Sequence, residues 1–582
     1  MYENIFTYSF FLNFLLSSIF IIVNIFFSIR ISHNESIKKI FFFNEFQPII
    51  IFYLIFAIFT IIFNLTLLVD YNFLSEIFFL IVFFQLIFLI HSFKLKIPFY
   101  RLKLLFKNKI VLILFISFFL ISILPISDAD SIAYISYLPS KIFLEGLKDI
   151  NLYKNQEFTL LSNTEIILII SSILKSDNFG SQLNLSALLF FMIINFKNHK
   201  NFFLIVLSSP LIIYFISAQK LQLFFAILFL ISFILLNQNF LKRKSELFIF
   251  IFLLTFYSSG KISYLLFTLP LFLYFFYENL KRWKSIIPYS IVCFLIIYLP
   301  LFILKQNYFG NILAPFFDSF IGQNLESYKA QAISLRASEG WISNPTDISL
   351  YLRPFISFEI STLSSSLGII FLLMLINYKT QKKTKYFPLI LIGLVLLTGQ
   401  ILPRYYFEAF LILAYFYNPK KFLIKLFIYS QVSIIFLISV VFIYFAYFKY
   451  NVIIDKDKYM NRFSYSFYNS NQHKKDNLKG NILDFSLDRQ SIFFKNNIYS
   501  YRYLGMLNYY NNDYEGNLKK YISENKIDYL ITNEDNFPIP NCIKTNEIKK
   551  TQRIKALRNF LVNPKIEYYK LLEIKENTCN IR

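Results

Sequence analysis

Long apolar runs, separated by short polar or basic segments, follow one another along most of the 582 residues of the chain. An apolar helix of about 20 residues spans a bilayer, and a somewhat shorter one can sit tilted or deep within a helix bundle. The pattern therefore predicts an α-helical polytopic membrane protein with about 14 transmembrane helices. The approximate bounds of the runs are 5–29, 48–69, 72–93, 110–126, 181–196, 201–217, 219–240, 246–259, 262–277, 286–304, 361–378, 386–401, 404–418 and 423–449.

Two apolar segments need separate interpretation. Residues 161–174 are apolar, but the polar residues 163–165 interrupt their start, so we expect an amphipathic or re-entrant segment instead of a crossing. The run 5–29 has neither a basic segment before it nor a small-residue cleavage site after it. We therefore expect this first run to be a retained helix and not a signal peptide.

Composition narrows the class of partner. Hydrophobic residues make up 56% of the chain and include 75 Phe, which we expect to face lipid or the protein core. The 58 Lys and Arg outnumber the 35 Asp and Glu, which gives a net charge of +23. These basic residues lie in short loops between apolar runs and form no separate basic domain. Membrane topology explains this charge better than nucleic acid does, so no nucleic-acid partner is expected.

The basic loops predict the orientation, because cytoplasmic loops of membrane proteins are enriched in Lys and Arg. The most basic short loop, 94–109, is therefore placed inside, and the helix 110–126 leads from it to the outer face. The N-terminus and everything after Tyr450 are extracytoplasmic in this topology. Counting onward places the further basic clusters inside: 197–200, 242–244, 281–284, 382–385 and 420–421.

The chain divides into three parts by composition. Residues 1–109 form an N-terminal transmembrane extension. Residues 110–450 form the main transmembrane module, whose substantial outer loops are 127–160 and 305–360. Residues 451–582 are polar and long enough for one small domain.

The polar C-terminal part has its own pattern. Residues 516–525 look helical, and residues 527–532 look like a strand that ends at a polar turn. We therefore predict a small extracytoplasmic α/β domain. In that environment Cys542 and Cys579 could form a disulfide, although the sequence leaves this open.

Two carboxylates stand directly after the outward helix. Asp128 and Asp130 follow Pro125, and charge at the mouth of a membrane is costly and usually functional. Residues 131–144 predict a short amphipathic helix on the outer surface, which Asp128 or Asp130 could cap for about 1 kcal/mol. Capping and chemistry both remain open for this pair.

Several cations fall on the same outer face. Each one alone is explained by a side chain that snorkels to the headgroups. Together with two aspartates they suit a lipid-linked phosphate or pyrophosphate. These cations are Lys220, Lys261, Arg336, Arg353 and Arg404.

Signals for other chemistry are weak. His33, His91, His199 and His473 are scattered, and no Cys or His cluster has zinc spacing, so no metal ligand is assigned. Two carboxylates make an incomplete shell for a divalent cation such as Mg or Mn, which leaves a cofactor unknown. The sequence contains no P-loop and no dinucleotide fingerprint.

Short motifs in a fixed order resemble a known family. They are Asp130-Ser131-Ile132-Ala133-Tyr134 with Leu138-Pro139, then Gly260-Lys261, then Tyr308-Phe309-Gly310-Asn311 with Pro315-Phe316, and Pro403-Arg404-Tyr405-Tyr406. In this order and topology, residues 110–420 resemble the GT-C superfamily of membrane glycosyltransferases. The likeness is greatest to bacterial members related to dolichyl-phosphate-mannose-protein mannosyltransferases. Ile135 stands where many relatives have His, and Ile312 where Pro is usual.

The resemblance implies a function and a set of roles. A GT-C enzyme of this type would transfer a sugar from a polyprenyl-phosphate-linked donor to a glycan, lipid or protein acceptor. The reaction would take place at the outer face of the bacterial cytoplasmic (inner) membrane, with inversion at the sugar carbon. Asp130 would be the general base and Asp128 its helper, and residues 110–450 would be the catalytic module. The departing phosphate would meet Lys261, Arg404, Lys220 and Arg353, and the acceptor loop would include Tyr134 and Asn311.

Three rival functions were weighed. A lipid-linked oligosaccharide polymerase or ligase is expected to carry Arg and His in the outer loop, and 305–360 contains Arg336 and Arg353 but no His. A transporter or flippase favours charges midway through the spans and repeated halves, and neither pattern is found. A membrane O-acyltransferase is expected to place a His within the bundle, where none is predicted.

Overall fold

The structure is a computed structural model, and helices dominate it as far as Phe463. Strands in the described part of the chain begin at Asn481. The structure describes residues 6, 9–91, 108–128, 130–147, 160–195, 199–238, 240–314, 352, 354–356, 366–377, 382–398, 402–419, 421–463, 480–484, 498–500, 514–533, 543–555 and 565–577.

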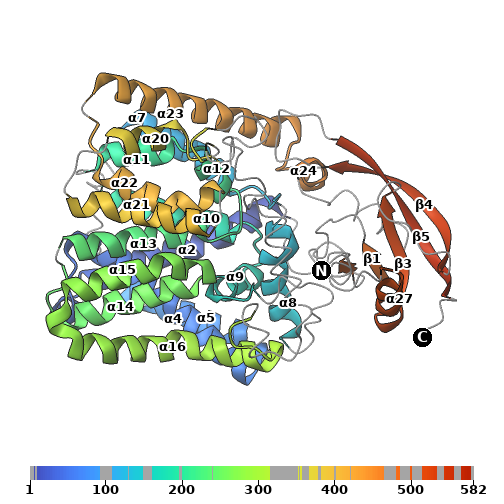
Figure 1. The fold of residues 1–582 in the computed structure, drawn as a ribbon, viewed down its shortest axis with the longest axis horizontal. Coiled ribbons are helices and arrows are strands. Elements are labelled where there is room, and N and C mark those ends of the chain that lie inside the picture. Colours follow the sequence, from blue (N-terminus) through green and yellow to red (C-terminus); the bar gives the residue numbers. More distant parts are fainter. Residues whose placement is uncertain are drawn as a thin grey trace.

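Each apolar run of the sequence contains at least one helix, and these helices pack side by side as a bundle (Figure 1). The bundle buries one continuous hydrophobic core. Its helices are α2 (Phe10–Ser32), α4 (Gln47–Val69), α5 (Leu74–His91), α7 (Lys109–Ser122), α10 (Phe179–Asn195), α11 (Lys200–Leu207), α12 (Pro210–Ile216), α13 (Gln222–Asn237), α14 (Lys244–Ser259), α15 (Leu265–Glu278), α16 (Trp283–Phe309), α20 (Ile369–Asn377), α21 (Lys382–Leu397), α22 (Phe407–Phe416) and α23 (Phe422–Ile443).

Five helical segments within the described residues are long and apolar enough to cross a bilayer. The remaining apolar helices are shorter, so the helical character of the prediction is confirmed while the count of about 14 crossings stays a prediction. The five segments are Phe10–Ser32, Asn44–Val69, Tyr71–His91, Leu280–Phe309 and Phe422–Lys449.

The run 201–217 is not the single helix that the sequence led us to expect. Helix α11 ends at Leu207, and α12 starts anew at Pro210. Proline has no N–H to continue a helix and disfavours the helical conformation of the residue before it. Ser208 lies at this break and is fully buried. Its carbonyl accepts a hydrogen bond of 2.9 Å from Gln431 Nε2 on α23.

The segment 161–174 forms α9 (Asn163–Ile173), a helix of 11 residues. At about 1.5 Å per residue it is too short to cross a bilayer. Ten of its residues are buried on all sides of the helix, so it is not an amphipathic surface helix. The re-entrant alternative agrees with this geometry.

The predicted outer helix at 131–144 is present in two pieces. A π-helical turn, η3 (Ser131–Ile135), leads into α8 (Tyr137–Glu145). Residues 138–142 are buried, and Leu144 and Glu145 at the end of the helix are exposed. Helix α8 packs on α9, where the Ser140 and Ser172 hydroxyl oxygens are 3.2 Å apart.

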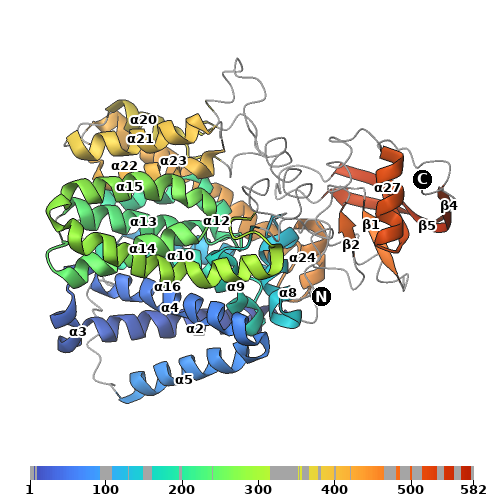
Figure 2. The same ribbon diagram turned by 60° about the horizontal axis from the view of Figure 1, so that its bottom comes forward.

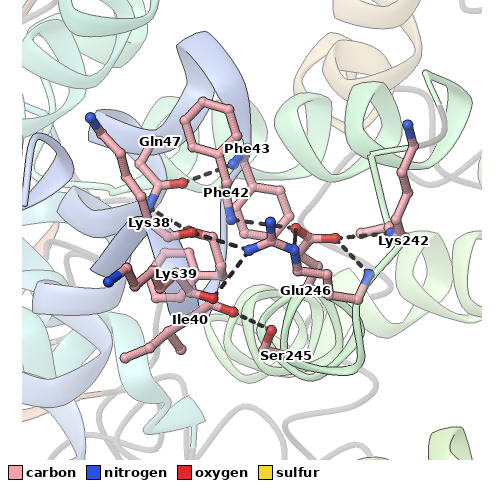
Figure 3. A network of polar contacts seen from close by, with 12 residues as sticks. Lys38, Lys39, Ile40, Phe42, Phe43, Gln47, Lys242, Ser245 and Glu246 are labelled. Atoms are coloured by element: carbon pink, nitrogen blue, oxygen red, sulfur yellow. Dashed lines mark hydrogen bonds and ion pairs between the residues drawn. The ribbon is translucent and has the colours of Figure 1, made fainter. Parts of the chain in front are cut away.

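The two ends of the bundle differ. Helices α8, α9 and α24 (Lys456–Phe463) lie at the end that faces the C-terminal sheet (Figure 1), and α3 (Glu35–Ile40) lies at the opposite end (Figure 2). At the α3 end, Arg243 Nη1 donates hydrogen bonds of 3.1 Å to the carbonyls of Lys38 and Lys39 (Figure 3). Basic segments from distant parts of the chain therefore meet there, as a shared cytoplasmic side would require.

The C-terminal part contains a five-stranded sheet in the order β2-β1-β3-β5-β4. Strands β2, β1 and β3 are parallel, whereas β5 is antiparallel to both β3 and β4. Helix α27 (Tyr514–Glu524) and strand β3 confirm the predicted helix at 516–525 and strand at 527–532. Cys542 and Cys579 lie outside the described residues. The strands are β1 (Asn481–Asp484), β2 (Ile498–Ser500), β3 (Ile527–Asn533), β4 (Ile543–Lys555) and β5 (Lys565–Asn577).

Candidate functional site

Three of the predicted site residues meet in one cluster. Lys220, in the turn between α12 and α13, forms an ion pair with Asp130 Oδ2. Arg404, in the short helix η8 (Pro403–Tyr406), places Nη1 3.6 Å from the same oxygen. The side chains are only 21% (Asp130), 10% (Lys220) and 14% (Arg404) exposed. Two cations from distant segments therefore converge on one carboxylate in a partly desolvated place, where charge interactions are strong.

Tyr214 completes this group, which we call the Asp130 cluster (Asp130, Tyr214, Lys220 and Arg404). Its hydroxyl accepts hydrogen bonds from Lys220 Nζ at 2.7 Å and from Arg404 Nη1 at 3.4 Å. Burial alone would lower the pKa of Lys220, but the charge of Asp130 helps to hold that pKa above its ordinary value. Lys220 is therefore a cation at neutral pH. Tyr214 was not identified from the sequence, because it is one aromatic residue among many in an apolar run.

Gln219 fixes the turn that carries Lys220. Its backbone N–H donates a hydrogen bond of 3.0 Å to Ser131 Oγ, directly beside Asp130. Its side-chain Nε2 donates to the carbonyl of Asp177, and its Oε1 accepts a bond of 2.5 Å from the N–H of Gly180. The residues that flank both members of the Asp130–Lys220 pair are thus joined directly.

Asp128 has a different environment from Asp130. It is 5% exposed, and its Oδ1 accepts a hydrogen bond of 2.9 Å from the N–H of Ser131. Its carbonyl accepts a second bond, of 3.1 Å, from the N–H of Ile132. This is the geometry of a residue that caps a helical turn. The capping alternative is therefore supported for Asp128, while its helper role stays a prediction.

Lys261 approaches the cluster through an aromatic ring. Its Nζ lies 5.5 Å from the centre of the Tyr405 ring, and the Arg404 guanidinium lies 5.3 Å from the same centre. The carbonyl of Gly260 accepts hydrogen bonds from the hydroxyls of Ser162 and Thr164, at 2.6 and 2.5 Å. These bonds attach the turn before Lys261 to the start of α9. Tyr405 therefore connects Lys261 with Arg404.

Two buried carboxylates near Lys261 were not assigned from the sequence. Glu408, on α22, is 1% exposed, and Tyr257 donates a hydrogen bond of 3.1 Å to its Oε1. Glu165 accepts bonds from the N–H and hydroxyl of Ser162 in a capping box at the start of α9. Both carboxylates lie within electrostatic range of Lys261. A usable signal was present, because an ionisable residue at the edge of an apolar run is a functional candidate.

Asn311 occupies a turn at the end of α16. Gly310 ends this helix with a φ of 66°, a left-handed conformation that glycine adopts without strain. Asn311 is fully buried, and its Oδ1 accepts a hydrogen bond of 2.9 Å from the N–H of Leu313. This geometry agrees with a loop anchor, and its predicted acceptor role stays a prediction. Arg353 and the side chain of Tyr134 lie outside the part of the chain that the structure describes.

A buried ion pair links α24 to the bundle beside the cluster. Asp177 is fully buried, and its Oδ2 is 3.5 Å from Lys456 Nζ on α24. Asn13 of α2 donates a side-chain hydrogen bond to the other carboxylate oxygen. The backbone carbonyl of Asp177 accepts the hydrogen bond from Gln219. Asp177 therefore contacts α2, α24 and the turn that carries Lys220.

The cluster is suited to an anionic ligand more than to a metal ion. Among the described residues, no group of three or more His, Cys, Asp or Glu could hold a metal ion. A divalent cation at Asp130 would also have to compete with Lys220 and Arg404 for the same carboxylate.

No family model, curated protein or solved structure matches the chain. The GT-C resemblance thus rests on motifs in the sequence. Function has to be argued from the geometry of the site.

Proposed function

We propose that the chain is a membrane glycosyltransferase that moves a sugar from a polyprenyl-phosphate-linked donor to an acceptor hydroxyl. The observation that carries the proposal is the convergence of Lys220 and Arg404 on Asp130. Paired Lys and Arg side chains bind phosphate, and a neighbouring carboxylate can accept a proton. The Asp130 cluster thus offers both functions that glycosyl transfer from a lipid phosphate needs.

In the proposed reaction, the acceptor oxygen attacks C1 of the donor sugar as the bond from C1 to the phosphate oxygen breaks. The proton of the acceptor hydroxyl passes to Asp130, and the electron pair of the broken bond leaves with the polyprenyl phosphate. Lys220 and Arg404 stabilise the negative charge that develops on this leaving group. A single displacement of this kind inverts the configuration at C1.

The cation pairing of Asp130 has a role before the donor binds. Buried charges are costly unless they are paired, so Asp130 offsets part of the positive charge of Lys220 and Arg404 in the absence of substrate. A bound phosphate would take over both cations. Asp130 would then be released from its ion pairs and become available to the acceptor hydroxyl.

The proposal includes the membrane topology. About 14 crossings would put the Asp130 cluster and a C-terminal α/β domain on the extracytoplasmic side of a bacterial inner membrane. Two observations support this arrangement: the C-terminal sheet lies beyond the α8 and α9 end of the bundle, and the Arg243 contacts lie at the other end (Figures 1 and 2).

Transfer can be tested in proteoliposomes that contain the full chain, a radiolabelled polyprenyl-phosphate hexose and a membrane extract as the source of acceptor. Glucose, galactose, mannose and N-acetylglucosamine donors form the panel. We expect protein-dependent release of polyprenyl phosphate from at least one donor. Release from none of them, by protein shown to be folded, would contradict the proposal.

A further inference from the structure

Glu408 is a buried carboxylate of the bundle, and one of its two oxygens has no described hydrogen-bond partner. Tyr257 donates to Oε1, but among the described residues no donor lies within hydrogen-bond distance of Oε2. The side chain is only 1% exposed, so bulk solvent does not reach it. A buried acceptor without a partner costs free energy, and a ligand hydroxyl can supply the missing donor.

Two other buried carboxylates of the bundle accept several hydrogen bonds each. Glu165 accepts two hydrogen bonds from Ser162. Glu246, at the opposite end of the bundle, accepts hydrogen bonds from the N–H groups of Phe42, Lys242 and Arg243 (Figure 3). Both cap the starts of helices, where a carboxylate has an ordinary structural role. Glu408 also lies in the first turn of a helix, α22, but among the described residues its Oε2 accepts no hydrogen bond.

The surroundings of Glu408 indicate the chemistry of its ligand. The Tyr257 and Tyr264 rings are stacked, with centres 4.7 Å apart, and Lys261 lies within electrostatic range. The nearby positive charge disfavours a metal cation, and the carboxylate itself repels a phosphate. A neutral hydroxyl group beside aromatic rings remains, and it can donate directly to Oε2.

The position of Glu408 relative to Arg404 indicates the size of that ligand. Glu408 follows Arg404 by four positions along η8 and α22, which is about one helical turn or roughly 6 Å along the axis. One monosaccharide attached to a phosphate has about this length. If Arg404 holds the phosphate, a hydroxyl on the far side of the sugar reaches the level of Glu408.

We infer that Glu408 is the specificity-determining residue of a monosaccharide subsite, where its Oε2 accepts a hydrogen bond from a hydroxyl of the donor sugar. This inference rests on the proposed function, because it assumes that Arg404 holds a lipid-linked phosphate. Because the carboxylate is 1% exposed, a sugar can reach Oε2 only after neighbouring side chains move, and Lys261 is one such described neighbour. The buried carboxylate then rejects lipid phosphates that lack a suitable hydroxyl, since they leave it unpaired.

The test compares two ligands on the purified full chain: bare polyprenyl phosphate and the same lipid phosphate that carries glucose, galactose or mannose. We expect at least one sugar to improve the Kd about tenfold or more over the bare lipid. Glu408→Gln should reduce this advantage to about threefold or less and leave the Kd of the bare lipid nearly unchanged. Glu246→Gln, which also alters a buried carboxylate, should leave both Kd values unchanged.

The outcomes separate the inference from the proposed function. If the bare lipid binds but no sugar improves its Kd, or if Glu408→Gln keeps the full advantage, the subsite is wrong while the phosphate site stands. If neither ligand binds the wild-type chain, both fail. Donors that lack one hydroxyl at a time make the test independent of the variant's folding. One of them must lose most of the advantage on the wild-type chain, and retention by all of them would overturn the subsite.

Discussion

At the scale of single residues, the two aspartates of the 128–130 segment have separate tasks. Asp128 accepts a backbone hydrogen bond and caps the π-helical turn, whereas Asp130 faces two cations. A buried ion pair is costly to break from one side only, because the remaining charge stays desolvated. We therefore expect changes to the ion pairs of Asp130 to lower the stability of the protein.

Lys220→Met should lower the free energy of unfolding, because it breaks a largely buried ion pair. We expect a loss of about 2 kcal/mol, since Asp130 still has Arg404 as a counter-charge. The double variant Lys220→Met with Asp130→Asn should lose less stability than the sum of the two single variants, since both single changes break the same ion pair. Thermal unfolding of the purified protein in detergent measures both effects. A loss in the double variant equal to the sum of the losses in Lys220→Met and Asp130→Asn would mean that the two residues are not energetically coupled.

At the scale of elements, the Lys220 turn depends on its close contact with α10. A Cβ on Gly180 would meet both the backbone and the side chain of Gln219, so any larger residue displaces this turn. Gly393, on α21, has no atom within 4 Å of the position of a Cβ and provides a matched control.

Gly180→Ala should therefore destabilise the protein by about 1–3 kcal/mol, because overpacking outweighs the gain in helix propensity. Gly393→Ala should be neutral or stabilising by up to about 1 kcal/mol. Differential unfolding of the two variants in the same detergent checks the difference. A Gly180→Ala protein as stable as Gly393→Ala would show that the Gln219 contact is loose.

The helices could be predicted from the sequence, but the contacts between them could not. Apolar runs predict the helices because a bilayer core demands unbroken apolar segments, and Pro210 contains the signal for the break between α11 and α12. Asp130, Lys220 and Arg404 were each identified from charge on one face. Their contacts could not be predicted, since the pairs are separated by 90 or more residues and only tertiary packing joins them. Tyr214 was missed because it is one aromatic residue among many, whereas Glu408 had a usable signal as an ionisable residue at the edge of an apolar run.

At the scale of the whole molecule, the two ends of the bundle face opposite sides of the membrane in the proposed topology. The Asp130 cluster is anchored, through Asp177, to Lys456 at the start of α24. Helix α3, whose carbonyls accept hydrogen bonds from Arg243, lies at the other end (Figure 2). Exposed lysines near each anchor, Lys458 and Lys242, can report the sidedness.

Single cysteines at these two positions should differ in their reaction with a membrane-impermeant maleimide, after Cys542 and Cys579 are replaced by Ser and the buried Cys293 by Ala. Lys458→Cys should be labelled in intact cells, because α24 is extracytoplasmic in the proposed topology. Lys242→Cys should be labelled only after permeabilisation. The reverse pattern, or labelling of both in intact cells, would contradict the orientation.

The most direct test of the central claim compares Asp130→Asn with Asp128→Asn in the proteoliposome transfer assay. Asn at position 130 keeps the size of the side chain but removes the base, so transfer should fall by about 100-fold or more. Asn at position 128 keeps an oxygen that can accept the bond from Ser131, so transfer should stay within about fivefold of wild type. A folded Asp130→Asn protein that transfers as well as Asp128→Asn would contradict glycosyl transfer through the Asp130 cluster.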